Sequence, residues 1–414
     1  MCRVPRRLII DLRPLRVSPA FRRMWGGSAV AQIGQSMAAV AVGIQVYDIT
    51  GSSFAVGMIG LAAFFPLVLF GLYGGSISDT HDRRTVALIS SSGLWVCAIA
   101  LVVQAWLSLE QLWLLYAVVA AQSAFFAVNT PARSAIVPRL IEPALLPAAN
   151  ALSSLTFGLG FMVGPVLSGL VIDAYGLTAT YTVDALLFAA AMYGVIRLPA
   201  IPPEAASQRT GWKAVWDGLR FLSTRRNLLM TFVVDLCAMV LAQPRALFPA
   251  LAATTFGGGA RTVGLLAAAP ALGSVLAGVL SGWLGTVRRQ GLMVVVMVCG
   301  YGASVALFGL TDILTWAMFF LVLTGAFDMV SAVFRSTILQ VATPDAMRGR
   351  LQGVFIVVVA GGPRLGDALV GTTAGIWGEQ AAIVIGGVAC IVATLFFVFR
   401  NRGFVRYDAL HPVA

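Results

Sequence analysis

The feature that most constrains this chain is a series of apolar segments, each about 20 residues long, that recurs from one end of the sequence to the other. A helix of that length spans the hydrocarbon layer of a bilayer. Only 11% of the 414 residues are charged, against about 25% in ordinary soluble proteins. The chain is therefore predicted to be a polytopic helical membrane protein.

Twelve membrane spans are predicted, at residues 24–47, 54–77, 86–107, 112–129, 147–172, 177–197, 228–251, 262–284, 291–310, 314–335, 350–376 and 380–399. The connections between them are too short to fold a catalytic domain, so we expect no enzyme. The single lysine, Lys213, belongs to no GxxxxGK[ST] pattern, which excludes a phosphate loop for ATP. Because the histidines, His81 and His411, lie outside the spans, no metal site or other cofactor is expected there.

The basic residues predict the orientation of the chain. If both termini are cytoplasmic, 25 of the 28 basic residues fall in cytoplasmic segments, a count that includes Arg133 and Arg335. Basic residues beside short loops are retained on the cytoplasmic side. Topology therefore explains the net charge of +11, and no nucleic-acid partner is needed. We expect a monomer in a bacterial inner membrane, with the bilayer, a proton and a small-molecule substrate as its partners.

A polar segment divides the spans into six and six. Residues 198–227 are predicted to form a cytoplasmic linker between an N-terminal half, residues 1–197, and a C-terminal half, residues 228–414. Apolar residues of the linker recur at helical spacing between Trp212 and Leu222. This pattern indicates an amphipathic helix, which either lies on the membrane surface or packs against the protein.

The two halves resemble each other in sequence. A shift of 202 residues places Arg133-Ser134 on Arg335-Ser336, and it also aligns four glycines, Gly160, Gly164, Gly169 and Gly176, with Gly362, Gly366, Gly371 and Gly378. Repeated halves with a substrate site between them are typical of secondary transporters. The predicted fold is an all-α membrane protein with twelve helices in two pseudo-symmetric six-helix halves.

A motif after the second span relates this fold to a known superfamily. Gly75, Asp79, Arg83 and Arg84 resemble the GxxxDRxxRR signature of the major facilitator superfamily, although Thr80 replaces one of its arginines. The resemblance implies that these four residues brace the helices on the cytoplasmic side.

A second motif lies in the fifth span. Gly160, Gly164, Pro165 and Gly169 have the small-residue spacing that permits close helix contact. They also resemble the GxxxGPxxGG signature of exporting antiporters of that superfamily, with Ser168 in place of one glycine. This resemblance implies efflux.

The C-terminal half carries a closer resemblance, to the enterobactin (siderophore) exporter family. The similar segments are residues 245–252, 263–270 with Gly273, 339–347 with 349–350, and 366–368. The resemblance implies export of an anionic or catecholate siderophore, with proton antiport as the expected coupling. Multidrug or macrolide-type efflux is the alternative, because those exporters share the layout. A nontransporting membrane sensor is the alternative from another class.

Charged residues inside the spans are the candidate site residues, because a charge at bilayer depth costs several kcal/mol unless it meets a partner or a cavity. They are Asp184, Asp235, Arg245, Asp328, Arg364 and Asp367. Asp235, Asp328 and Asp367 are the proton-coupling candidates. Arg245 and Arg364, with the polar residues Gln32 and Gln35, are the candidates for binding cargo.

Spacing suggests partners for some of these charges. Arg364 and Asp367 lie three residues apart on one helical face, so they are alternatively a self-neutralising pair. Asp235 and Arg245 are about 15 Å apart along a continuous helix, too far to pair directly. Asp184 is expected to form a structural pair.

Overall fold

The computed structural model describes residues 11–199, 201, 212–342 and 345–407, and every regular element within these ranges is a helix. The N-terminal helices are α1 (Arg13–Val17), α2 (Pro19–Thr50), α3 (Ser53–Thr80), α4 (Arg83–Trp106), α5 (Leu112–Leu140), η1 (Pro143–Leu145) and α6 (Leu146–Ile196). The C-terminal helices are α7 (Trp212–Thr224), α8 (Arg226–Leu236), η2 (Cys237–Leu241), η3 (Arg245–Leu247), α9 (Phe248–Thr254), α10 (Ala260–Val279), η4 (Ser281–Thr286), α11 (Gln290–Gly309), α12 (Leu314–Ala342), α13 (Asp345–Trp377), α14 (Glu379–Arg400) and α15 (Arg402–Val405).

The helices account for the twelve predicted membrane crossings. Ten helical segments of the described chain are long and apolar enough to span a bilayer. One of these, which contains α6, is two spans joined at Gly176, where φ is 80°. A glycine adopts this conformation without the steric cost of a Cβ. With α13, the crossings number twelve, and the predicted twelve-helix fold is confirmed.

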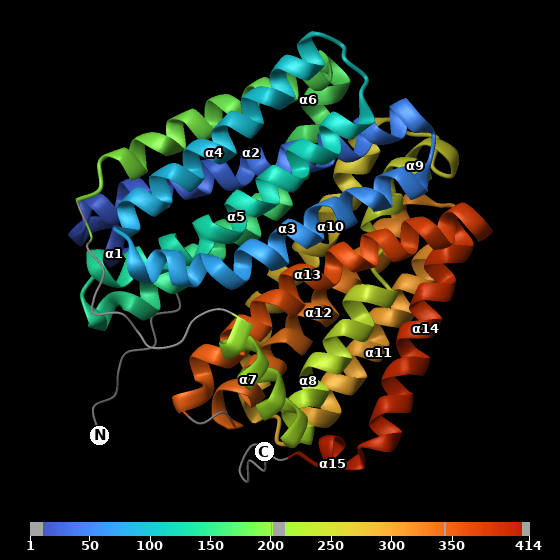
Figure 1. The fold of residues 1–414 in the computed structure, drawn as a ribbon. Helices are drawn as coiled ribbons and strands as arrows, with labels where there is room; N and C mark the ends of the chain where they lie inside the picture. Colours follow the sequence, from blue (N-terminus) through green and yellow to red (C-terminus); the bar gives the residue numbers. More distant parts are fainter. Residues whose placement is uncertain (1–10, 200, 202–211, 343–344, 408–414) are drawn as a thin grey trace.

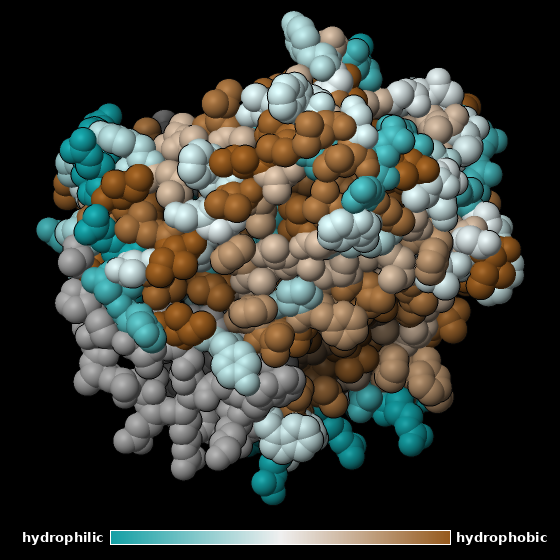
Figure 2. Space-filling model, turned by 45° about the horizontal axis from the view of Figure 1, so that its top comes forward, coloured by the Kyte–Doolittle hydropathy of each residue, from teal (hydrophilic) through white to brown (hydrophobic). Residues whose placement is uncertain are grey.

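Large apolar side chains cover the outside of the bundle. Val279, Phe399 and Phe65 are each at least 65% exposed in the isolated chain. Figure 2 shows hydrophobic residues gathered in a broad band on one face, with hydrophilic residues toward its edges. Such a surface is matched to lipid rather than to water.

The seventh span differs from the prediction. Residues 228–251 were expected to form one continuous helix, but the chain is broken into α8, the π-helical η2, the 3-10 turn η3 and α9. Pro244, in the interruption, has no amide hydrogen to donate to a preceding turn. The helical separation calculated for Asp235 and Arg245 therefore does not apply.

Two helices extend beyond their predicted spans. The predicted spans 112–129 and 314–335 end too early, because α5 continues to Leu140 and α12 to Ala342. Arg133 and Arg335 consequently lie within helices that are long and apolar enough to cross a membrane. Both guanidinium groups have polar partners inside the protein.

The two sets of helices meet most closely at one end of the bundle. The main contacts between the sets are those of α3 with α13 and of α6 with α10. We call this the distal end, because it carries the α2–α3 and α9–α10 connections and lies opposite α1, α7 and α15 (Figure 1). Gly57 of α3 faces Gly371 of α13, and Gly264 of α10 faces Pro165 of α6. The absence of side chains at these glycines permits the close approach.

The amphipathic helix of the linker is α7. Leu222 is buried in the C-terminal core, while Trp216 and Leu219 are exposed. The helix is therefore attached to the protein and still presents an apolar face. The linker residues before it, 202–211, lie outside the described residues.

Candidate functional site

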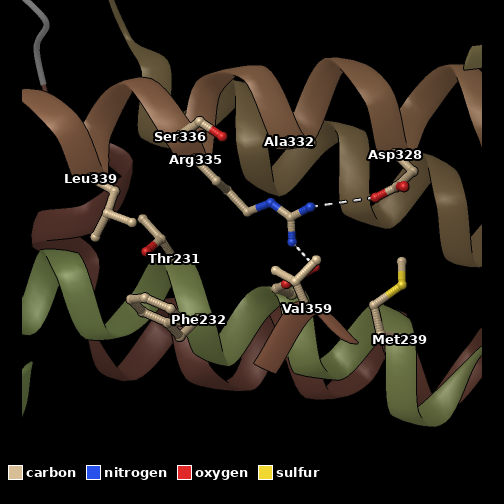
Figure 3. A pocket seen from close by; sticks show the side chains of 10 residues that line it. Thr231, Phe232, Met239, Asp328, Ala332, Arg335, Ser336, Leu339 and Val359 are labelled. Carbon is tan, nitrogen blue, oxygen red and sulfur yellow. Dashed lines mark hydrogen bonds and ion pairs between the residues drawn. The ribbon is translucent and has the colours of Figure 1, made fainter. Parts of the chain in front are cut away.

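An arginine with two carboxylates forms the most concentrated group of charges inside the bundle. Arg335 of α12 makes ion pairs with Asp235 of α8 through Nη1 and with Asp328 of its own helix through Nη2, the latter at 3.4 Å. Figure 3 shows the guanidinium extending from α12 toward α8 and toward Asp328. The side chains of Arg335 and Asp235 are only 10% and 8% exposed. We call these three residues the Arg335 cluster.

The cluster lines a cavity of about 120 Å³ between α8, α12 and α13. Its other walls include Thr231, Ser336 and Val359. A cavity of this size, with charged and hydroxyl groups, holds several water molecules but is far smaller than a drug-sized ligand site. It is suited to a proton or water, and the cargo requires a larger space.

Arg245, Arg364 and Asp367 form a second group, where the two sets of helices meet. Arg245 is exposed on η3, which contacts both α3 and α13. Asp367 interacts electrostatically with both arginines and lies beside the backbone of Ala246. Arg364 and Asp367 do not approach to ion-pair distance in the described chain, so this group leaves donors unpaired.

The close approach of α3 explains where this second group sits. A Cβ on Gly60 of α3 would collide with the Arg364 carbonyl and lie 2.8 Å from Asp367 Cβ. The glycine therefore allows the charged turn of α13 to pack directly against the N-terminal helices.

The polar residues of α2 serve different purposes. Gln32 packs its side chain against Gly160, and Gln35 is half-buried. Gln45 is buried, where its amide exchanges hydrogen bonds with Gln104 and accepts one from the Tyr181 hydroxyl. Gln45 therefore joins helices instead of lining a cavity.

The glycine motif of the fifth span lies on two contact surfaces of α6. Gly160 and Gly164 pack against α2, at Gln32 and Ser36. Gly169 packs against Ala260 of α10, and Pro165 offers its carbonyl to the space beside Gly264. Thus the motif brings α6 close to a helix of its own half and to a helix of the other half.

The brace motif lies between α3 and α4. Gly75 and Asp79 belong to the last turns of α3, and their surroundings lie outside what the structure describes. Arg83 donates to the Ala135 carbonyl of α5, and Arg84 donates to the Ile196 carbonyl at the end of α6. Asp82, which was not among the candidates, caps α4 and accepts from the Ile201 amide.

Asp184 does not form the expected structural pair. It is 2% exposed, and its Oδ1 has no hydrogen-bond partner among the described residues. That oxygen lies against α2, where a Cβ on Gly34 would come within 2.6 Å of it. Glycine at position 34 therefore makes room for a buried carboxyl that forms no ion pair with the described residues.

We expect Asp184→Asn to leave the melting temperature of the purified protein unchanged, because the amide keeps the shape of the carboxyl and removes its charge. Asp235→Asn is the matched control, and it is expected to lower the melting temperature because it takes a carboxylate from Arg335. A large loss of stability in Asp184→Asn alone would show that the carboxylate has a partner.

Arg335 was not predicted as a site residue because, at the end of a predicted span, it was counted with the cytoplasmic basic residues. One signal pointed to it: the repeat places Arg133 and Arg335 at matching positions of the two halves. An arginine that only sets the orientation of the chain in the membrane need not recur at matching positions of the two halves.

Twelve helices in two halves, an apolar outer surface and charged residues inside the helical bundle define a multi-pass membrane transporter rather than an enzyme. The family model described as transmembrane secretion effector, within the major facilitator superfamily, matches residues 10–409. The chain belongs to this family.

Curated relatives and solved structures agree with this assignment. The enterobactin exporter EntS of Citrobacter koseri is 26% identical over 409 residues, which cover 98% of this chain and 97% of that protein. EntS of Shigella boydii is 28% identical over 367 residues, covering 88% and 87%. The fold is similar to that of the nucleoside transporter NupG, with a TM-score of 0.75 at 14% identity over 92% of this chain and 99% of that one. A bacterial homolog of the human lysosomal transporter Spinster, solved in an inward-facing and unoccupied conformation, has a TM-score of 0.74 at 14% identity, covering 95% and 98%.

Proposed function

We propose that this protein is a secondary active exporter that moves an enterobactin-like siderophore, catecholate or anionic, out of the bacterial cytoplasm by proton antiport. The similarity to the enterobactin exporters over nearly the whole chain supports the cargo class. The exposed Arg245 at the junction of the halves supports an anionic cargo rather than a cationic drug. In this proposal the protein lies in the inner membrane with both termini in the cytoplasm. A single chain is the transport unit.

The Arg335 cluster is the observation that carries proton coupling. With both carboxylates ionised, the cluster has a net charge of −1, and one bound proton neutralises it. Two carboxylates that share one cation titrate as a unit, so the cluster is suited to gaining and losing one proton. The adjoining cavity has room for water molecules beside the two carboxyl groups.

The interrupted seventh span links the proton to movement. Asp235 lies on α8, directly before η2, while Arg335 lies on α12. Protonation of Asp235 weakens its attraction to Arg335, and the π-helical turn and the break at residues 242–244 allow α8 to shift relative to α9. With both termini in the cytoplasm, as proposed, the closed distal end faces outward.

The cargo proposal is tested by cargo retention. Cells that lack the protein are grown under iron limitation, and secreted and intracellular siderophore are compared while drug sensitivity is measured in parallel. Siderophore trapped inside the cells is the expected result. Normal secretion with increased drug sensitivity would instead assign the protein to multidrug efflux.

The coupling proposal is tested in proteoliposomes. We expect Asp235→Asn and Asp328→Asn to lose export driven by a proton gradient while retaining exchange of labelled cargo across the membrane, because exchange needs no net proton movement. Asp367→Asn is the comparison variant, since Asp367 lies outside the cluster, beside Arg245 and Arg364. Gradient-driven export by both cluster variants would contradict the coupling role.

A further inference from the structure

Arg133 of α5 places a positive charge inside the N-terminal helices. Its Nη1 donates to Ser28 Oγ of α2 at 2.7 Å, and its Nη2 donates to Ser91 Oγ of α4 at 3.2 Å. Its Nε is enclosed and has no hydrogen-bond acceptor within the described chain. Because both partners are neutral hydroxyls, they orient the guanidinium without balancing its charge.

A comparison of the two halves shows that the positive charge lacks carboxylate partners in only one of them among the described residues. Arg335 is the counterpart of Arg133, 202 residues later, and two carboxylates neutralise it. The same shift takes Asp235 to Ile33 and Asp328 to Phe126, so the N-terminal half lacks both acids. Among the described residues, Arg335 therefore has carboxylate partners and its counterpart Arg133 has none.

The unpaired carboxyl of Asp184 does not supply the missing charge. It lies against Gly34, six residues along α2 from Ser28 and thus about 9 Å away along the helix axis. Among the described residues, no ion pair forms between an acid and Arg133. Within the described chain Arg133 has no carboxylate partner, and a guanidinium inside a membrane bundle is costly without an opposite charge, so a ligand anion is a suitable complement.

Two polar residues close to Arg133 in the sequence are exposed. Arg133 itself is half-buried, and Thr130 and Ser134 on the same helix are exposed although α5 crosses the membrane. The counterparts of Arg133 and Ser134, which are Arg335 and Ser336, both line the cavity in the C-terminal half. The repeat therefore places Arg133 and Ser134 at the positions that correspond to two cavity-lining residues of the C-terminal half.

We propose that Arg133, oriented by Ser28 and Ser91, binds an oxyanion of the cargo, a carboxylate or catecholate oxygen. A guanidinium has five N–H donors, and the two hydroxyls use two of them. In this arrangement the N-terminal half binds the cargo's negative charge, while the Arg335 cluster of the C-terminal half binds the proton. The choice of oxyanion rests on the proposed function, whereas the presence of an anion site does not.

The test is equilibrium binding to the full-length protein in lipid nanodiscs. The probe is 2,3-dihydroxybenzoate, which combines a carboxylate with a catechol, and uncharged catechol is the reference ligand. We expect the parent to bind the anion in saturable fashion and Arg133→Gln to bind it at least tenfold more weakly, with catechol affected little.

A substitution at Ser91 can place a negative charge beside Arg133 while the arginine itself is kept. Ser91→Asp supplies the acid that the N-terminal half lacks, so it is expected to abolish anion binding while keeping or raising the melting temperature. Ser91→Asn, which is similar in size and uncharged, is the matched control and is expected to retain binding. Retained binding in Ser91→Asp, with the fold intact, would overturn the proposal.

The remaining outcomes are also decisive. Unchanged anion affinity in Arg133→Gln would place the anion elsewhere, and the absence of saturable binding by the parent would remove the site altogether. If cells lacking the protein secrete siderophore normally while the anion still binds through Arg133, the cargo proposal fails and the anion site stands for a different acidic cargo.

Discussion

Replacing Arg335 by glutamine is expected to abolish export and to lower the melting temperature more than the loss of either of its carboxylate partners. In this variant the carboxylates of Asp235 and Asp328 repel each other, because the cation between them is gone. Removal of one partner from a buried ion pair typically costs about 3–5 kcal/mol, because the remaining charge is buried and unpaired. Melting of the purified protein and gradient-driven export in proteoliposomes are the two measurements.

A compensated variant separates stability from coupling. Combining Arg335→Gln with Asp235→Asn and Asp328→Asn removes all three charges together, so we expect the melting temperature to recover toward that of the parent. Export driven by a proton gradient is expected to remain absent, because no carboxyl is left in the cluster. If the triple variant stayed as unstable as Arg335→Gln, loss of packing rather than loss of charge balance would explain the single variant.

The second large effect is expected for Gly57→Leu, at the closed distal end. A Cβ at position 57 would lie 2.6 Å from the Asp367 carbonyl oxygen and 2.9 Å from Gly371 Cα. Both are backbone atoms of α13, which cannot rotate out of the way, so α3 and α13 must separate. We expect the distal end to open and export to fall at least tenfold, because one of the two alternating states is lost.

Spin labels at Leu109 and Ile313 report this opening directly. These exposed residues lie on distal connections of the two halves, and the distance between the labels is expected to increase in Gly57→Leu. Gly71→Leu is the matched control on the same helix, since a Cβ there meets no atom within 4 Å. An unchanged distance in Gly57→Leu would show that the closed end tolerates a side chain at this contact.

Much of the fold was predictable from local pattern. The apolar runs had to become membrane helices, because a backbone in lipid must satisfy its own hydrogen bonds. Spans 147–172 and 177–197 were correctly separated at Gly176 even though they form one nearly continuous helix. The seventh span was wrongly predicted to be continuous, because hydropathy averages over a window and does not register a local break around Pro244.

The candidate site was predictable only in part. Residue type alone marked Asp235, Asp328 and Asp367 as costly charges within apolar segments, since that inference needs no neighbours. It did not indicate that the first two share Arg335 or that the third lies beside Arg245 and Arg364. For Asp184 the expected ion-pair partner is not found among the described residues, and burial alone does not reveal whether a donor lies nearby.

The sequence by itself determined the number of crossings, the division into related halves and the set of charges that the membrane must accommodate. These features follow from composition and from the spacing of residues within a few turns of helix. Only the tertiary structure decided which charges meet, because Arg335 reaches Asp235 across 100 residues of sequence and Arg133 reaches Ser28 across 105. Pairing depends on the rotation and depth of packed helices, and a change of one residue in helical register turns a side chain by about 100°. For that reason two arginines at matching positions of the repeat have opposite surroundings, one neutralised by acids and the other held by hydroxyls.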